Sequence, residues 1–350
     1  MKDSCEKAEK SLKYHTSNEW WMPIERVFAG TALRSLRVIC PLCKESGLVT
    51  TRWIKGPALK PIYILHIKWR KVRKVCELTE EQSANIRGTV SIRETDIEEL
   101  LGSRRSFVLF SGGKDSLATL VYLKELARKN SNDLTAIYVD TTAGLPATKR
   151  YVRRVCRHLE IRLEVVKPKV DYFTLAKKWG IPSFGYRWCC RELKIKPIQG
   201  YLDKIQQPKV VFDGIRAVES NLRKQYIPIW YHPTFKCLSV SAIFHWSDEE
   251  VASCINSNGI PKTLLHSLGT STECWCGAYK TETDFRKLYQ LDQDMFYRLA
   301  ELEKHNKNRY TFLYKDGQQI PLRKLERQIL KENRHKQNKR TIAGREKAKV

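Results

Sequence analysis

A short segment at residues 111–116 has the residue types that bind phosphate. It reads SGGKDS and separates an apolar run over 107–110 from a helical pattern over 115–129. Where a strand passes through a glycine turn into a helix, backbone N–H groups and the positive end of the helix dipole converge on an anion. Lys114 adds positive charge, and the hydroxyls of Ser111 and Ser116 can donate to phosphate oxygens. The spacing differs from the Walker loop, and the alternative is a tight turn built from small residues.

Two cysteine pairs could hold a metal cluster. Cys189 and Cys190 are adjacent, and Cys274 and Cys276 are separated by one residue. Together they offer the four thiolates that an iron–sulfur cluster requires. A three-cysteine cluster with one open iron, a zinc site and ordinary buried thiols are the alternatives, and the sequence leaves them open. Three further cysteines with apolar neighbours are expected in the core: Cys156, Cys237 and Cys254.

A second set of metal ligands lies nearer the N-terminus. Cys40 and Cys43 have the spacing of a zinc knuckle, and His66 with Cys76 could complete a tetrahedral Zn²⁺ site. The alternative for His66 is an exposed strand histidine. Two runs rich in β-branched and aromatic residues are expected to be strands, 48–54 and 62–69. Residues 36–78 therefore resemble a small zinc-ribbon module.

Positive charge indicates a polyanionic partner. The 350 residues carry a net charge of +26, which favours nucleic acid, RNA or DNA, or a phosphorylated surface. A lysine-rich solvated surface is the alternative. Basic and aromatic residues also interleave in one region, at Arg52, Trp53, Lys68, Trp69, Arg70 and Arg73. This mixture suits phosphate contacts and base stacking on RNA, although a solvated basic face fits equally well.

Strands and helices alternate around the glycine segment. Strands are expected at 107–110, 134–139, 161–166 and 209–212, with helices over 115–129 and 147–159 between them. The sequence SDEE at 247–250 is a capping box that opens a further helix. This alternation predicts an α/β fold, a parallel sheet with helices on both faces.

Four motifs in this region together resemble one superfamily. They are SGGKDS at 111–116, VDTTAGLPAT at 139–148, RWCCRELK at 187–194 and DGIRAVESNLR at 213–223. Over about residues 105–290 the chain resembles the PP-loop ATP pyrophosphatases and phosphoadenosine phosphosulfate (PAPS) reductases, whose fold is adenine nucleotide alpha hydrolase-like. Thr142 and Ala147 depart from the second motif, and the Cys-x-Cys pair is one residue shorter than the family's usual Cys-x-x-Cys.

The resemblance implies a set of site residues. An adenine nucleotide, either ATP or a sulfonucleotide, would be bound by Ser111, Gly112, Gly113, Lys114, Asp115, Ser116, Asp140, Thr141, Gly214, Arg216 and Arg223. The two arginines would face phosphate or sulfate groups, the alternative being surface ion pairs. The resemblance implies catalytic roles for Lys114, Asp115, Cys189 and Cys190. It also implies a [4Fe-4S] cluster on Cys189, Cys190, Cys274 and Cys276.

Three functions are compatible with this pattern. The favoured one is ATP-dependent thiolation, with Mg²⁺ on the phosphates, an adenylylated intermediate and a nucleic-acid acceptor. The second is a sulfonucleotide reductase that releases sulfite. Two features favour thiolation over reduction. SGGKDS is closer to the loops of the ATP-using members of the superfamily, and no cysteine follows Cys276, whereas reductases resemble one another in a C-terminal Glu-Cys-Gly segment. A non-catalytic nucleic-acid-binding protein is the third. Either enzyme would need a sulfur donor or reductant protein.

Composition suggests a compartment and a division of the chain. The polar start and eleven cysteines without an export signal predict a reducing, cytoplasmic protein, and no apolar run approaches the ~20 residues that cross a bilayer. Leu291, Met295, Leu299 and Leu302 have helical spacing, and the last stretch is basic with an end expected to be disordered. The expected segments are an arm (1–35), the zinc-ribbon-like module (36–78), a connector (79–103), the PP-loop domain (104–290) and a C-terminal helix with basic tail (291–350). The sequence does not predict an oligomeric state.

Overall fold

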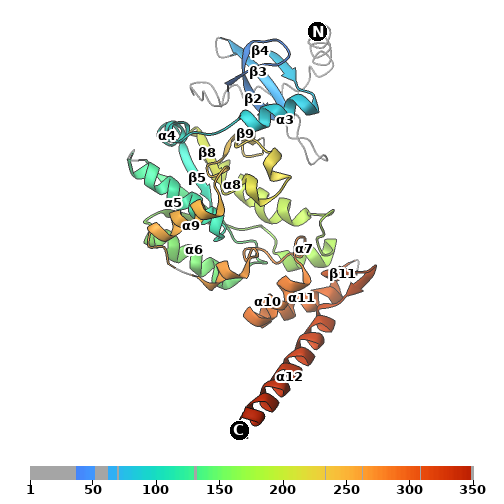
Figure 1. Cartoon of the computed structure of the whole chain (residues 1–350). Coiled ribbons are helices and arrows are strands. Elements are labelled where there is room, and N and C mark those ends of the chain that lie inside the picture. Colours follow the sequence, from blue (N-terminus) through green and yellow to red (C-terminus); the bar gives the residue numbers. More distant parts are fainter. Residues whose placement is uncertain are drawn as a thin grey trace. The chain divides into compact units, whose positions relative to one another are not determined.

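The computed structural model describes residues 37–51, 62–68, 71–129, 132–232, 234–261, 263–307 and 309–347 (Figure 1). The expected N-terminal arm lies outside these residues, as do Arg52, Trp53, Trp69, Arg70 and the side chain of Lys68. The chain forms two compact units. The first comprises Met1–Tyr138, Tyr151–Val166 and Ile198–Lys262, and the second comprises Val139–Arg150, Lys167–Pro197 and Thr263–Val350.

The first unit begins with a small antiparallel sheet, as the sequence predicts. Its strands follow one another in the order β1 (Arg37–Ile39), β2 (Ser46–Thr51), β3 (Ile62–Lys68) and β4 (Lys71–Glu77). The register of β3 against β4 shifts between His66 and Ile67. Apolar side chains on neighbouring strands are buried together, among them Leu48, Val49, Ile64, Leu65 and Val75.

A six-stranded sheet forms the centre of the first unit. Its strands are β5 (Arg105–Leu109), β6 (Leu134–Val139), β7 (Arg162–Val166), β8 (Lys209–Asp213), β9 (Ile229–His232) and β10 (Cys237–Ser241), in the order β7-β6-β5-β8-β10-β9. The β5–β6, β5–β8 and β8–β10 pairs are parallel, which confirms the predicted sheet. The edge strand β9 is antiparallel to β10, which the sequence analysis did not predict.

The strand order reverses beside β5. The chain proceeds from β5 outward to β6 and β7, then returns to place β8 against the other side of β5. In open α/β sheets, ligands bind beyond the carboxyl ends of the strands at such a reversal. The loops that follow β5 and β8 are therefore the expected binding position.

Helices flank this sheet. In the first unit they are α3 (Glu80–Thr89), α4 (Glu94–Ser103), α5 (Lys114–Lys129), α8 (Lys196–Leu202) and α9 (Asp248–Ser257), with the short 3₁₀ turns η3 (Ala217–Glu219) and η4 (Arg223–Gln225). The helix α6 (Pro146–His158) begins in the second unit and ends in the first. Ala118 of α5 packs with Val251 of α9 and with Ile243. Ser247 caps α9 with Glu250, which confirms the predicted capping box.

The second unit is mainly helical. It contains α7 (Tyr172–Trp179), the π-helical segment η2 (Cys190–Ile195), η5 (Leu264–Leu268), α10 (Glu282–Leu291), α11 (Gln293–His305), the hairpin β11 (Leu313–Lys315) and β12 (Gln318–Ile320), and α12 (Leu322–Lys347). Trp275, Phe285 and Phe296 are fully buried in its core. Among the described residues, no helix combines the length and the apolar character needed to cross a bilayer.

Two expectations for the C-terminal region differ from the structure. Met295, Leu299 and Leu302 are buried on α11, but Leu291 ends α10 and is exposed, because Asp292 ends that helix and caps the next one. The expected disordered end is wrong as far as Lys347, since α12 continues to that residue. Buried Leu322 and Leu325 anchor the start of α12, and no proline or glycine interrupts the chain before Gly344.

Candidate functional site

The segment 111–116 forms a braced turn between β5 and α5. Gly112 has φ +83°, a backbone conformation that L side chains rarely adopt. The Ser116 hydroxyl donates to the Gly113 carbonyl (3.0 Å) and lies 3.0 Å from the Ser111 hydroxyl. The backbone N–H of Ser111 donates to the Ser116 hydroxyl (3.3 Å), and that of Gly113 to the Ser111 hydroxyl (3.3 Å). Hydrogen bonds of both serines therefore hold the turn in shape, and α5 begins inside the segment at Lys114.

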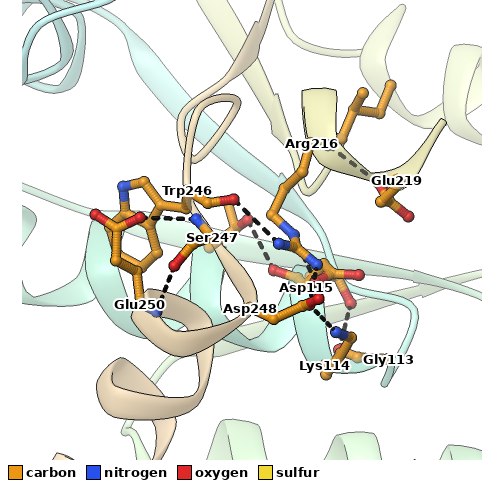
Figure 2. Close-up of polar contacts among 12 residues, drawn as sticks. Gly113, Lys114, Asp115, Arg216, Glu219, Trp246, Ser247, Asp248 and Glu250 are labelled. Carbon is orange, nitrogen blue, oxygen red and sulfur yellow. Dashed lines mark hydrogen bonds and ion pairs between the residues drawn. The ribbon is translucent and has the colours of Figure 1, made fainter. Parts of the chain in front are cut away.

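A buried arginine fixes the first turn of α5. Only 2 % of the Arg216 side chain is exposed, and its guanidinium donates to Asp115 (2.8 Å), Asp248 (2.7 Å) and the Trp246 carbonyl (3.0 Å). Figure 2 shows the two carboxylates gathered around this guanidinium. All three guanidinium nitrogens have protein partners, so Arg216 positions Asp115 and the start of α9 at the same time.

Lys114 lies beside the same carboxylates (Figure 2). Its ammonium pairs with Asp248, and about half of its side chain is exposed. Hydrogen bonds from Lys114 and Arg216 lower the pKa of Asp248 to about 2, so that carboxylate is ionised at neutral pH. Burial raises the pKa of Asp115, against the opposing effect of Arg216. Lys114 thus places one partly exposed cation next to the turn at 111–116, a type of turn that can bind phosphate.

The loop after β8 touches the turn directly. A side-chain carbon at Gly214 would lie 2.8 Å from the Ser116 nitrogen and 2.9 Å from the Asp115 carbonyl carbon, closer than such atoms can approach. Glycine at this position therefore lets the β8 loop pack against the first residues of α5. The preceding Asp213 accepts hydrogen bonds from Ser241 (2.7 Å) and the Ile215 N–H (3.1 Å), while burial raises its pKa. The two loops at the strand reversal are held together in this way.

Arg223 is placed differently from Arg216. It pairs with Glu219 through an ion pair, and about a third of its side chain is exposed. Glu219 also accepts a hydrogen bond from the Arg216 backbone N–H (3.0 Å). Arg223 thus makes a partly exposed ion pair, whereas the Arg216 side chain is buried among its partners, and the contact of either arginine with phosphate or sulfate stays a prediction.

Asp140 and Thr141 belong to the second unit. Asp140 pairs with Lys149 (2.7 Å) and Lys167 (3.5 Å), and these contacts outweigh the effect of burial and lower the pKa of its carboxyl. The Thr141 hydroxyl is buried and donates to the Glu273 carbonyl (2.8 Å). Thr141 therefore joins the segment after β6 to the segment that carries Cys274 and Cys276.

The four cysteines expected to act together do meet in the second unit. The Cys276 and Cys189 sulfurs lie 3.4 Å apart, and Cys190 and Cys274 pack against the same buried cluster. Hydrogen bonding among the thiols lowers the pKa of Cys190 and Cys276 and raises the pKa of Cys189 and Cys274. Four cysteines gathered in one buried cluster are residues of the type that binds an iron–sulfur cluster or zinc.

A buried ion pair supports this sulfur cluster. Lys194 donates to Glu273 (2.9 Å), whose side chain is almost fully buried. Burial alone would lower the pKa of Lys194, but Glu273 and the nearby thiols reverse the effect and raise it. A permanent cation beside several thiolates offsets their mutual repulsion. Neither residue was predicted from the sequence as part of this site, although Lys194 lies within the motif RWCCRELK.

Cys190 begins the π-helical segment η2. The Lys196 N–H bonds to the Arg191 carbonyl, five residues back instead of the four of an α-helix. Such turns occur frequently at functional sites. The wider turn begins directly after Cys189, so the backbone geometry at the cysteine pair differs from that of a regular helix.

The N-terminal ligand set is also brought together. The ligand atoms of Cys40, Cys43, His66 and Cys76 all lie within 4.8 Å of one another. The Cys43 and Cys76 sulfurs are 3.9 Å apart, close to the about 3.8 Å expected for two thiolates bound tetrahedrally at 2.3 Å from zinc. Cys43 lies 3.3 Å from His66 Nε2, and His66 Nδ1 lies 3.2 Å from the Ser46 carbonyl, the usual second contact of a ligating histidine. One nitrogen and three sulfurs in this arrangement fit Zn²⁺.

Gly47 allows His66 to reach this cluster. A side-chain carbon at Gly47 would lie 2.3 Å from Ile64 Cγ2 and 3.1 Å from the imidazole of His66. The sequence analysis did not single out this glycine, because its role depends on the pairing of β2 with β3.

Comparison with known proteins identifies the family. The family model of the phosphoadenosine phosphosulfate reductase domain matches residues 105–299. The chain belongs to this family. Its members are nucleotide-binding enzyme domains, so the predicted α/β fold and nucleotide-binding class are confirmed.

Individual relatives are more distant. An uncharacterized protein of Methanocaldococcus jannaschii is 31 % identical over 211 residues, which cover 57 % of this chain and 42 % of that protein. The chain thus spans less than half the length of this curated relative. Among solved structures, PAPS reductase from Candida auris has a TM-score of 0.42 and 20 % identity, covering 57 % of this chain and 96 % of that one. The U34-tRNA thiolase NcsA from Methanococcus maripaludis, solved with its [4Fe-4S] cluster, has a TM-score of 0.38 and 15 % identity, covering 73 % and 82 %.

Proposed function

We propose that the chain is an ATP-dependent sulfurtransferase that activates an oxygen of a nucleic-acid acceptor by adenylylation and replaces it with sulfur. The observation that carries this proposal is the turn at 111–116, braced by its serines and packed against Gly214 at the strand reversal. Backbone N–H groups at the start of a helix donate hydrogen bonds to phosphate oxygens, so this turn suits the terminal phosphates of ATP.

The residues of this site have separate roles. The turn would bind the pyrophosphate portion of ATP, and Lys114 would move from Asp248 to the phosphates, since its ammonium is partly exposed. Arg216 would act as a positioning residue, because its guanidinium is occupied by protein partners. Mg²⁺ would neutralise phosphate charge during attack of the acceptor oxygen on the α-phosphorus, with pyrophosphate as the leaving group.

The cysteine cluster would serve the second half of the reaction, in which sulfur displaces AMP together with the acceptor oxygen. Cys189, Cys190, Cys274 and Cys276 would hold an iron–sulfur group, which would supply sulfur or bind it for transfer. Lys194 and Glu273 would keep the thiolates in place. Cys40, Cys43, His66 and Cys76 would hold a structural Zn²⁺, and the net charge of +26 favours a nucleic acid as acceptor.

Two measurements test this proposal. The full chain is purified without oxygen and analysed for iron, sulfide and zinc, and its nucleotide turnover is compared with ATP, adenosine phosphosulfate and PAPS. Formation of AMP and pyrophosphate from ATP, with iron and sulfide bound, is the expected result. Cys189→Ser should abolish iron binding, and a Cys189→Ser protein with full iron content would refute the ligand assignment.

The second candidate is a sulfonucleotide reductase, which the family match favours. In that case a thiolate attacks the sulfur and expels the nucleotide. Release of sulfite from either sulfonucleotide, without AMP formation from ATP, would replace the proposed reaction.

Variants of the turn at 111–116 distinguish either enzyme from a non-catalytic nucleic-acid-binding protein. Lys114→Ala should reduce AMP formation strongly, while Lys129→Ala, at the exposed end of the same helix, should not. Nucleic-acid binding without pyrophosphate release, unchanged in Lys114→Ala, would favour the non-catalytic protein.

A further inference from the structure

Three exposed side chains form a platform next to the cysteine cluster. Phe184 is 74 % exposed and Tyr279 is 56 % exposed, although both are large and hydrophobic. Their ring centroids lie 5.8 Å apart with the planes nearly perpendicular. The Arg187 guanidinium lies 5.6 Å from the Phe184 ring and 5.5 Å from the Tyr279 ring, and it hydrogen-bonds the Tyr279 hydroxyl. We call these three residues the aromatic platform.

The platform is held by the segments that carry the cysteines. Arg187 lies two residues before Cys189, and Tyr279 lies three residues after Cys276. The Cys276 and Cys189 sulfurs are 3.4 Å apart, so the two segments are in contact at the cluster itself. A ligand on the platform would therefore lie near the sulfurs.

Both halves of the platform have a defined backbone. Ser183 and Tyr186 exchange backbone hydrogen bonds (3.3 and 3.1 Å), which present Phe184 at the tip of a turn. Trp188 anchors the following residues, since it is buried, donates to the Gly180 carbonyl (3.1 Å) and stacks on Tyr172. Two exposed rings held on turns with a buried anchor cost little conformational entropy when a ligand binds.

Gly277 shapes the other half. Its φ is +94°, and a side-chain carbon there would lie 2.5 Å from the ring of Phe312. The Lys280 N–H bonds to the Gly277 carbonyl (3.2 Å) and closes the turn that carries Tyr279. Gly277 therefore turns the chain sharply after Cys276.

The composition of the platform indicates its ligand. Exposed aromatic rings combined with an arginine bind unpaired nucleobases by stacking and by cation–π contact. The surrounding charge is strongly positive, since residues 167–197 contain eight Lys or Arg against two Asp or Glu. A polyanion that carries planar bases meets both conditions, whereas a protein partner would need a much larger apolar surface.

We propose that Phe184, Arg187 and Tyr279 bind an unpaired nucleobase of single-stranded nucleic acid and present it to the cysteine cluster. This inference rests on the proposed function in one respect, the nucleic-acid acceptor, and adds the site where the acceptor base docks. Arg187 and the two rings are positioning residues, because they hold the base while the cysteines carry the sulfur chemistry.

Binding of fluorescent single-stranded RNA to the full chain tests the platform. The probe is a short oligouridylate with one 2-aminopurine, whose emission falls when the base stacks. Phe184→Ala and Tyr279→Ala should each weaken binding by about tenfold and remove the quenching, because stacking of one base contributes that much. Tyr279→Phe should retain the quenching. Tyr314→Ala removes another exposed tyrosine (72 %) of the same unit and should leave both signals unchanged.

Inorganic polyphosphate distinguishes stacking from charge. It carries phosphate charge without bases, so its affinity should be the same for wild type, Phe184→Ala and Tyr279→Ala. Wild-type RNA affinity and quenching in both alanine variants would overturn the proposal, as would an equal loss of polyphosphate binding. ATP turnover is measured on the same samples. RNA quenching without AMP formation would refute the proposed function and leave the platform intact, and the reverse result would refute the platform alone.

Discussion

Gly214→Ala should damage nucleotide binding through one added methyl group. The new carbon would lie 2.8 Å from the Ser116 nitrogen and 2.9 Å from two further backbone atoms of residues 115 and 116. Backbone cannot rotate away as a flexible side chain can, so the β8 loop or the start of α5 must shift. Overpacking of this kind costs about 1–3 kcal/mol of folding free energy, which lowers Tm by about 2–12 °C.

The same shift moves the N–H groups of the turn at 111–116. Loss of one hydrogen bond to a charged phosphate costs about 1.5–3 kcal/mol, so ATP should bind about 10- to 150-fold more weakly. Isothermal titration calorimetry with ATP and Mg²⁺ measures the affinity, and thermal unfolding measures Tm.

Gly200→Ala is the matched control. Gly200 is an exposed residue of α8, and a side-chain carbon there has no atom within 4 Å. The substitution should keep wild-type ATP affinity and raise stability by up to about 1 kcal/mol, because alanine favours the helix. Wild-type Tm and ATP affinity in Gly214→Ala would refute the close approach of the two loops as the basis of the site.

Three further predictions concern stability and zinc. Arg216→Lys keeps the charge but loses the separate donors to Asp115, Asp248 and the Trp246 carbonyl. Urea unfolding should show that its free energy of unfolding is lower by about 3 kcal/mol. Arg162→Lys, at an exposed ion pair, should leave the free energy of unfolding unchanged. Burial raises the pKa of Glu303 from 4.5 to about 7, so the folded state holds this proton more tightly than the unfolded state. The free energy of unfolding should therefore fall by up to about 3 kcal/mol as the pH rises from about 4.5 to 7. Glu303→Gln should flatten this part of the curve of Tm against pH. Gly47→Ala should displace His66 and weaken zinc binding, measured by competition with a chromogenic chelator, and unchanged zinc affinity would argue against His66 as a ligand.

The sequence carries most of the information on the central sheet. Strand β6 has the predicted bounds, because a strand buried on both faces reads as one continuous apolar run. Strands β9 and β10 were not predicted, since each is short and forms by pairing with its neighbours, β9 with β10 and β10 with β8. The helical end of α12 was missed because a dense basic charge suggested disorder, whereas helix propensity and a few buried apolar residues at its start decide the structure.

In the candidate sites, the sequence predicts the residues of local motifs but not the partners of these residues. Local motifs pointed to the turn at 111–116 and to both cysteine sets, and the structure brings each set together, while their ligands stay predictions. The partners of these residues could not be read from the sequence. Lys114 and Asp248 are 134 residues apart, and Asp115 and Arg216 are 101 residues apart. Only the order of the strands brings such pairs together.

The π-helical turn after Cys189 has a consequence for how this protein could evolve. One turn of that helix holds an extra residue, so deletion of a single codon within 191–195 would restore the ordinary α-helical repeat. Cys189 and Cys190 would then rotate by about 100° around the helix axis relative to α8. The deletion would leave the sequences of all strands unchanged. A single in-frame insertion or deletion could in this way separate or reunite the two cysteine pairs.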